Sequence, residues 1–141
     1  MKKLQSGMTL IEILVAVLVL AIGVLGSVAM QTRALAYNQS SFNRAQASMA
    51  ANDILDRMRA NNGEARAGSY NLSLDASASG SSVAQVDLSE WLTSLSTLLP
   101  SGDGSIAVAS NVATVTIQWN EARAEQSANS VLQQFIYTSE L

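Results

Sequence analysis

Glu12 is the residue whose type and position most clearly call for chemistry. It is the only charged residue between Lys3 and Arg33, near the start of a run that stays apolar as far as Met30. A carboxylate in hydrocarbon is costly unless it finds a partner. The sequence therefore predicts either an incidental charge close to a membrane face or an ion pair that is needed inside the membrane.

The residue types on which most enzymes depend are missing. The chain has no cysteine and no histidine, which excludes disulfides, thiolate or imidazole metal sites and a Ser-His-Asp triad. Asp103 and Gly104 have acidic neighbours, but without EF-hand spacing they indicate a polar turn. The missing residue types do not rule out catalysis, but its commonest side chains are absent, and we expect no catalytic residue, no metal site, no cofactor and no enzyme activity.

The second half of the chain is acidic. From residue 67 onward the only base is Arg123, against seven acids, which leaves a net charge of −6. Such a surface repels phosphate backbones, so nucleic-acid binding is not expected.

A membrane-spanning helix is predicted near the N-terminus. Residues 13–30, ILVAVLVLAIGVLGSVAM, carry no charge. With residues 8–11 they reach the ~20 residues that a helix needs to cross a hydrocarbon core of ~30 Å. Lys2 and Lys3 precede the run, and by the positive-inside rule they keep the N-terminus in the cytoplasm and direct the remainder outward.

Two general explanations compete for this segment. A secretory signal peptide also begins with lysines and an apolar run, and residues 34–36 offer a small-residue cleavage site. Against it, the run exceeds the usual ~7–15 residues, and a carboxylate opposes insertion. The other explanation is a plain signal anchor in which Glu12 is incidental.

A third explanation accounts for Glu12. The stretch KKLQSG followed by MTLIE resembles the class III signal of type IV prepilins, which has a short basic leader ending in Gly and a Glu at the fifth position after it. Here the leader is residues 1–7, the first mature residue is Met8, where the family usually has Phe, and the fifth is Glu12. The resemblance implies that a prepilin peptidase cuts the Gly7–Met8 bond and methylates the new amine of Met8.

The resemblance also gives the charged residues their roles. Removing Lys2 and Lys3 deletes the charges that hold the N-terminus in the cytosol. Glu12 lies four residues after Met8, a helical rise of about 6 Å, so its carboxylate is shallow in the membrane. Its implied partner is the Met8 amine of an adjacent subunit, which it would neutralise during assembly.

The helix is expected to continue beyond the membrane. Residues 31–61 contain no Pro and no Gly, and residues 61–63 (NNG) provide a C-terminal stop. Gly23, Gly26 and Ser27 are places where the helix could bend. An apolar stripe predicts the core-facing side; it comprises Leu35, Phe42, Ala45, Met49, Ile54, Leu55 and Met58.

A linker-like stretch and a second helix follow. Residues 64–82 are low in complexity, with a short extended piece at 70–74. Residues 87–100 predict a helix that Asp87 caps, with Glu90 three residues on, and that ends at Pro100. Its leucine stripe indicates core packing; the members are Leu88, Trp91, Leu92, Leu95, Leu98 and Leu99.

Three strands are predicted at residues 105–109, 112–119 and 131–138, with a hairpin turn at Ser110 and Asn111 between the first two. The sum is an α+β, pilin-like fold with an antiparallel meander. The expected divisions are a leader (1–7), a transmembrane half-helix (8–30), an amphipathic half-helix (31–62), a variable loop region (63–86), and a helix plus sheet (87–141).

Within the pilin superfamily the chain resembles PilV-type minor pilins. The resemblance lies in MTLIEILVAVLVLAIGVLG, AANDILDRMRANNG, LLPSGDGSI and TVTIQWNEAR. Many relatives carry a cysteine pair that this chain lacks. The resemblance implies a minor subunit of type IV pili, which serve twitching motility and adhesion. It implies an inner-membrane protein with a periplasmic C-terminal part that later joins the fibre at the cell surface.

The implied partners are prepilin peptidase, other minor pilins, the major pilin and the inner-membrane assembly platform. A minor pseudopilin of a type II secretion system shares the signal, the methylation and the Glu, and it remains an alternative. A periplasmic binding module or enzyme on a signal anchor is the second alternative.

Overall fold

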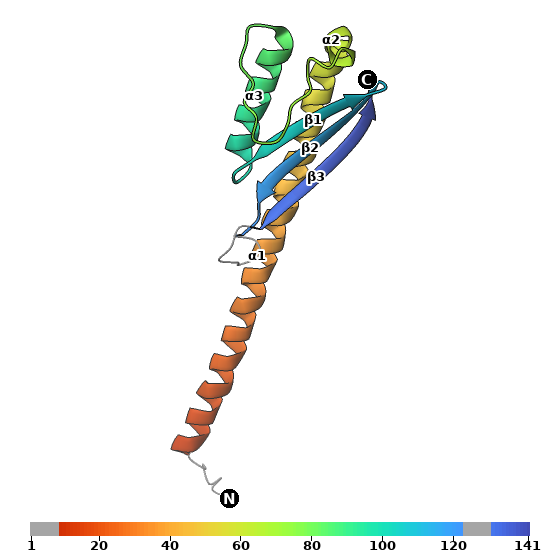
Figure 1. The fold of residues 1–141 in the computed structure, drawn as a ribbon. Helices are drawn as coiled ribbons and strands as arrows, with labels where there is room; N and C mark the ends of the chain where they lie inside the picture. The colour runs from red at the N-terminus through yellow and green to blue at the C-terminus, as the bar shows by residue number, and fades with distance from the viewer. Residues whose placement is uncertain (1–8, 123–130) are drawn as a thin grey trace, which may run out of the picture. The chain divides into compact units, whose positions relative to one another are not determined.

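The computed structural model describes residues 9–122 and 131–141. Its elements follow in the order α1, α2, α3, β1, β2, β3 (Figure 1). The chain divides into two compact units, Met1–Ala36 and Tyr37–Leu141, and α1 (Leu10–Ala60) contributes residues to both. The α+β, pilin-like class predicted from the sequence is confirmed: a long apolar N-terminal helix, further short helices and a three-stranded antiparallel sheet.

In the first unit, α1 is an apolar helix with exposed side chains. An 18-residue window of α1 reaches a mean hydropathy of 2.8 with none of the window buried. By length and composition α1 can cross a membrane, and it is the one helix in the described ranges that meets this criterion. The helix continues through Gly23 and Gly26 without interruption.

In the second unit, α1 buries only part of the predicted stripe, together with other positions. Ile54, Leu55 and Met58 are buried as expected, but Phe42 and Met49 are 55% and 64% exposed. Leu35 and Ala45, from the same predicted stripe, are exposed as well. The buried positions nearer the N-terminus are Asn43, Ala47, Ala50 and Ala51. The seven-residue spacing of Phe42 and Met49 recurs one position later at Asn43 and Ala50, where the small side chain of Ala50 leaves room for the Trp91 ring of another element.

Of the two shorter helices, one was not predicted from the sequence and the other begins before the predicted residue 87. α2 (Asn62–Arg66) follows α1 almost at once, and α3 spans Val83–Leu98. The cap of α3 is Ser82, whose hydroxyl accepts a hydrogen bond from the Gln85 N–H, so the prediction that Asp87 caps this helix is wrong. Asp87 lies in the first half of the helix, where its carboxylate binds groups from other elements.

The leucine stripe of α3 is largely, but not entirely, core. Leu88, Trp91, Leu95 and Leu99 are buried, Leu92 is half-buried, and Leu98 is 44% exposed.

The strands β1 (Asp103–Ala109), β2 (Val112–Asn120) and β3 (Leu132–Glu140) form one antiparallel sheet in the order β1-β2-β3 (Figure 1). Ser110 and Asn111 form the predicted turn and both have positive φ, 50° and 67°, as a two-residue type I′ turn requires. Along β2 every second residue is buried. The sheet therefore turns one face to the core.

The stretch predicted as a linker has a defined structure. Tyr70 is fully buried. Leu72 exchanges two backbone hydrogen bonds with Ile106 of β1, each of 2.9 Å. This bridge places the predicted extended piece against the outer edge of β1.

A substitution at Gly104 would test how closely β1 packs on α3. A Cβ at this position would overlap the Trp91 ring and the Leu95 methyl group, whereas nothing lies within 4 Å of a Cβ at Gly63. Gly104→Ala is expected to lower the free energy of unfolding of the second unit by about 1–3 kcal/mol, the usual cost of overpacking. Gly63→Ala, within α2, is expected to raise it by about 0.5–1 kcal/mol.

Denaturant unfolding of the detergent-solubilised chain measures both effects through tryptophan fluorescence, because Trp91 and Trp119, the chain's two tryptophans, are buried in this unit. Equal stability of the two variants would contradict the close packing.

Candidate functional site

The N-terminal site is described only in part. Lys2, Lys3, Gly7 and Met8 lie outside the described residues. Glu12 lies within them, in the first turn of α1. The side chain is exposed, and among the described residues no ion pair reaches it.

Glu12 has a local role that the sequence analysis missed. Its carboxylate accepts the Thr9 backbone N–H at 3.4 Å and the Thr9 hydroxyl at 3.5 Å. Thr9 directly precedes the helix, so the T-x-x-E spacing of Thr9 and Glu12 is that of a capping box, a signal present in the sequence. Both contacts are long and therefore weak. The carboxylate also lies in the first turn of α1, at the positive end of the helix dipole.

A second polar cluster joins α1 to α3. The Arg57 guanidinium contacts Asp53 at 3.2 Å, Asp87 at 3.3 Å and Glu90 at 2.7 Å. The hydrogen bond to Glu90 raises the pKa of Arg57, and Asp53 and Asp87 add to the effect against the opposing effect of burial. Arg57 is therefore a fixed cation that holds the first turns of α3 against α1.

Tyr70 connects the same cluster to the segment after α2. Its hydroxyl donates to the Asp87 carboxylate at 2.6 Å and accepts from the Asn61 side-chain amide at 3.2 Å. Burial raises the pKa of Tyr70, and the hydrogen bond to Asp87 raises it further. The Asp87 carboxylate therefore binds both Arg57 of α1 and Tyr70 of the segment after α2. These contacts, and not the capping of α3, are its role.

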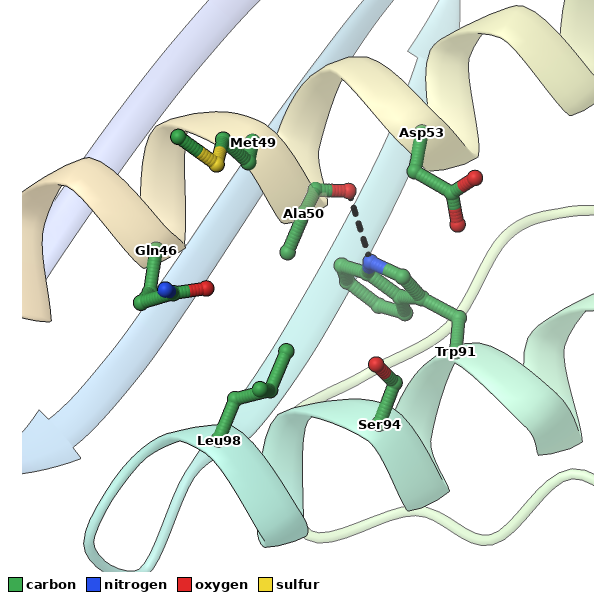
Figure 2. A pocket seen from close by; sticks show the side chains of 7 residues that line it. All are labelled: Gln46, Met49, Ala50, Asp53, Trp91, Ser94 and Leu98. Atoms are coloured by element: carbon green, nitrogen blue, oxygen red, sulfur yellow. Dashed lines mark hydrogen bonds between the residues drawn. The ribbon is translucent and has the colours of Figure 1, made fainter.

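A shallow pocket of about 160 Å³ lies between α1 and α3 (Figure 2). The Trp91 indole N–H donates to the Ala50 carbonyl at 3.0 Å in its wall. Its only ionisable lining residue is Asp53, which is paired with Arg57. The lining residues are Gln46, Met49, Ala50, Asp53, Trp91, Ser94 and Leu98.

Ser94 and Asp53 both line this pocket, but in the described part of the chain no hydrogen bond joins the Ser94 hydroxyl to the Asp53 carboxylate. Across residues 9–122 and 131–141, no three His, Cys, Asp or Glu side chains are grouped to hold a metal ion. The interactions that the described residues show around Glu12 and Arg57 are helix capping and charge pairing.

The comparisons with known proteins agree with the N-terminal site. Residues 2–28 match the family model for the prokaryotic N-terminal methylation motif. This motif supports a type IV pilin-like protein or pseudopilin, a class that is typically structural and not enzymatic. It implies processing by a prepilin peptidase and assembly with other pilins in the membrane. No significant match was found among curated proteins or among solved structures.

The raised pKa of Tyr70 predicts a pH dependence. Below about pH 10, the ordinary pKa of a tyrosine, the phenol is neutral in the folded and the unfolded chain, and its contribution to stability is complete. Above that pH the unfolded chain loses the proton first, so this contribution is lost as the pH rises through the higher folded pKa. Tyr70→Phe is therefore expected to reduce the fall in the free energy of unfolding above about pH 10.

Urea unfolding followed by tryptophan fluorescence, from neutral to alkaline pH, measures this fall. Tyr37→Phe is the matched control, because Tyr37 is 73% exposed. The same alkaline fall in wild type and Tyr70→Phe would refute the assignment.

Proposed function

We propose that the chain is a minor pilin of a type IV pilus. The observation that carries the proposal is the match of residues 2–28 to the methylation motif, with Glu12 in the first turn of an apolar helix. In this function prepilin peptidase cleaves the Gly7–Met8 bond and methylates the amine of Met8. Cleavage removes Lys2 and Lys3, whose charges would otherwise keep the helix from leaving the bilayer.

Glu12 then pairs with the Met8 amine of a neighbouring subunit. Its contacts within its own chain are long and its carboxylate is exposed. A carboxylate with so little local compensation gains most from a cation when it enters an apolar environment. The pairing therefore joins subunits in register while the apolar helices pack together.

The subunit acts through binding and not through catalysis. Before assembly it is held in the inner membrane, with its C-terminal part in the periplasm. It then joins other minor pilins on the assembly platform, in the complex that primes the fibre. In the finished fibre it lies at the tip, above the major pilin. The resemblance of LLPSGDGSI and TVTIQWNEAR to PilV-type minor pilins supports the pilus over a secretion system. The fibre then serves twitching motility and adhesion.

Glu12→Gln separates the pairing role from the capping role. Glutamine can still accept the Thr9 N–H in a capping box but carries no charge. We expect Glu12→Gln and Glu12→Ala both to lower the amount of the chain in purified fibres by about tenfold or more, because each ~1.4 kcal/mol lost from association is a factor of ten. Quantitative immunoblotting of sheared fibres measures this amount.

Glu64→Gln is the matched control, since it removes the same charge from α2, outside the membrane segment. N-terminal sequencing of the membrane-extracted proteins is expected to begin at methylated Met8 in every case. If Glu12→Gln entered the fibres at the wild-type amount while Glu12→Ala did not, the role of Glu12 would be helix capping and not charge pairing. A membrane form that still begins at Met1 would refute the pilin assignment.

Deleting the chain distinguishes the pilus from the secretion system. We expect the deletion to abolish surface pili and twitching while exoprotein release continues, and we expect the wild-type chain to restore both pili and twitching. Electron microscopy, a twitching assay and an assay of exoproteins in the medium provide the measurements. Exoproteins trapped in the periplasm of cells with normal pili would instead assign the chain to type II secretion as a minor pseudopilin.

A further inference from the structure

One apolar stripe of α1 lies on the surface of the second unit. Phe42 and Met49 are more than half exposed, and Ala45 between them is exposed as well. The three residues stand at positions i, i+3 and i+7, the spacing of the a and d residues of a coiled coil, which pack against a second helix. Exposed apolar residues that lie together in this way usually mark an interaction site.

The stripe borders the pocket between α1 and α3. Met49 lines the pocket from α1, and Leu98, which is 44% exposed, lines it from α3. Figure 2 shows Gln46 and Leu98 pointing toward one another across it. The hydrogen bond from the Trp91 indole to the Ala50 carbonyl fixes the wall between the two helices. With a volume of about 160 Å³, the pocket has room for one large apolar side chain.

The charge of this groove is concentrated at one end. Beyond the pocket, the carboxylates of Asp53, Asp87 and Glu90 surround the single guanidinium of Arg57, which leaves this end with a net charge of −2. The side chains of Asp53 and Glu90 are 53% and 60% exposed. The groove is therefore apolar at Phe42 and Met49 and negative about one helical turn further along α1.

We propose that the groove between α1 and α3 binds a basic amphipathic helix of another protein. An apolar side chain of that helix fills the pocket, and a Lys or Arg about one turn away lies beside Asp53 and Glu90. The heptad spacing and the groove between two helices select a helix, and the negative end selects its basic residues. The inference does not rest on the proposed function, because every residue that carries it belongs to the second unit.

The stripe of a second copy does not have this chemistry. Its one base between Phe42 and Asp53 is Arg44, which stands two positions after Phe42 and so points about 200° away around the helix axis. A parallel pair of stripes in register would place Asp53 against Asp53, and an antiparallel pair centred on Met49 would place Asp53 opposite Ala45. Neither pair supplies a cation to the negative end.

Cross-linking from a single cysteine tests the proposal in the full-length chain, which has no cysteine of its own. Gln46→Cys places a benzophenone maleimide at the pocket, and Thr138→Cys places the same label on the exposed face of the sheet as a control. After irradiation of labelled membranes we expect an adduct from Gln46→Cys that Thr138→Cys does not give. Mass spectrometry should map it to a segment with apolar residues at heptad spacing and a Lys or Arg one turn away.

A second substitution shows whether the stripe binds that segment. Met49→Gln is expected to lower the yield of the adduct by about tenfold or more, because it removes an apolar contact and keeps a good helix former. Ile136→Gln, the same replacement at a residue of the sheet that is 61% exposed, should leave the yield unchanged.

Two synthetic helical peptides measure the preference for charge. The first carries Leu at a, Ala at d and Lys at e and g of two heptads, and its twin carries Glu in place of Lys. By fluorescence anisotropy with the detergent-solubilised chain, we expect the Lys peptide to bind at least about tenfold more tightly than the twin and to weaken with added salt. Glu90→Gln should reduce this difference, whereas Glu140→Gln, which removes the same charge from β3, should not.

Four results would overturn the proposal. They are no adduct from Gln46→Cys, an adduct that joins two copies of this chain, a captured segment without Lys or Arg, and equal affinity for the two peptides. These results concern the groove alone, because none of them depends on whether the chain begins at Met1 or at Met8.

Discussion

The second unit depends above all on the close packing of α1 at its alanines. Ala47 and Ala51 are fully buried and Ala50 nearly so. The methyl side chain of Ala50 leaves room beside α1 for the Trp91 ring of α3, whose indole N–H donates to the Ala50 carbonyl at 3.0 Å. Larger residues at these positions would displace the side chains that cover them. The core of the second unit is built on the same continuous helix that carries the apolar segment, which is long enough to cross a membrane.

The sequence predicted which elements exist better than which faces they bury. Alternation along β2 and the turn at Ser110 and Asn111 are local signals, and both were confirmed. The core-facing side of α1 was predicted from the spacing of its apolar residues, which included Phe42 and Met49. The fold instead buries Asn43 and Ala50 one position later, because side chains of other elements, such as Trp91, cover that side of the helix. That preference is set by tertiary packing and has no local signature.

The candidate site was only partly predictable for a similar reason. Glu12 stood out because it is a lone charge in an apolar run, while its T-x-x-E capping spacing was overlooked although it is equally local. Asp87 has the type and spacing of a cap, yet Ser82 takes that position. The Asp87 carboxylate is instead bound by Tyr70 and Arg57, residues 17 and 30 positions away. Such partners become visible only when the segments are brought together.

Under the proposed function, capping and assembly are not independent roles for Glu12. The carboxylate lies at a helix N-terminus, where the Thr9 N–H and the helix dipole compensate part of its charge. Partial compensation lets a subunit wait in the membrane at less than the full cost of an isolated charge. Full compensation within the chain would leave nothing for a neighbour to supply. Under the proposed function, the long contacts to Thr9 are therefore functional. They lower the free-energy cost of the Glu12 charge in the unassembled subunit, and they are weak enough that pairing with a neighbour's Met8 amine stabilises this charge further.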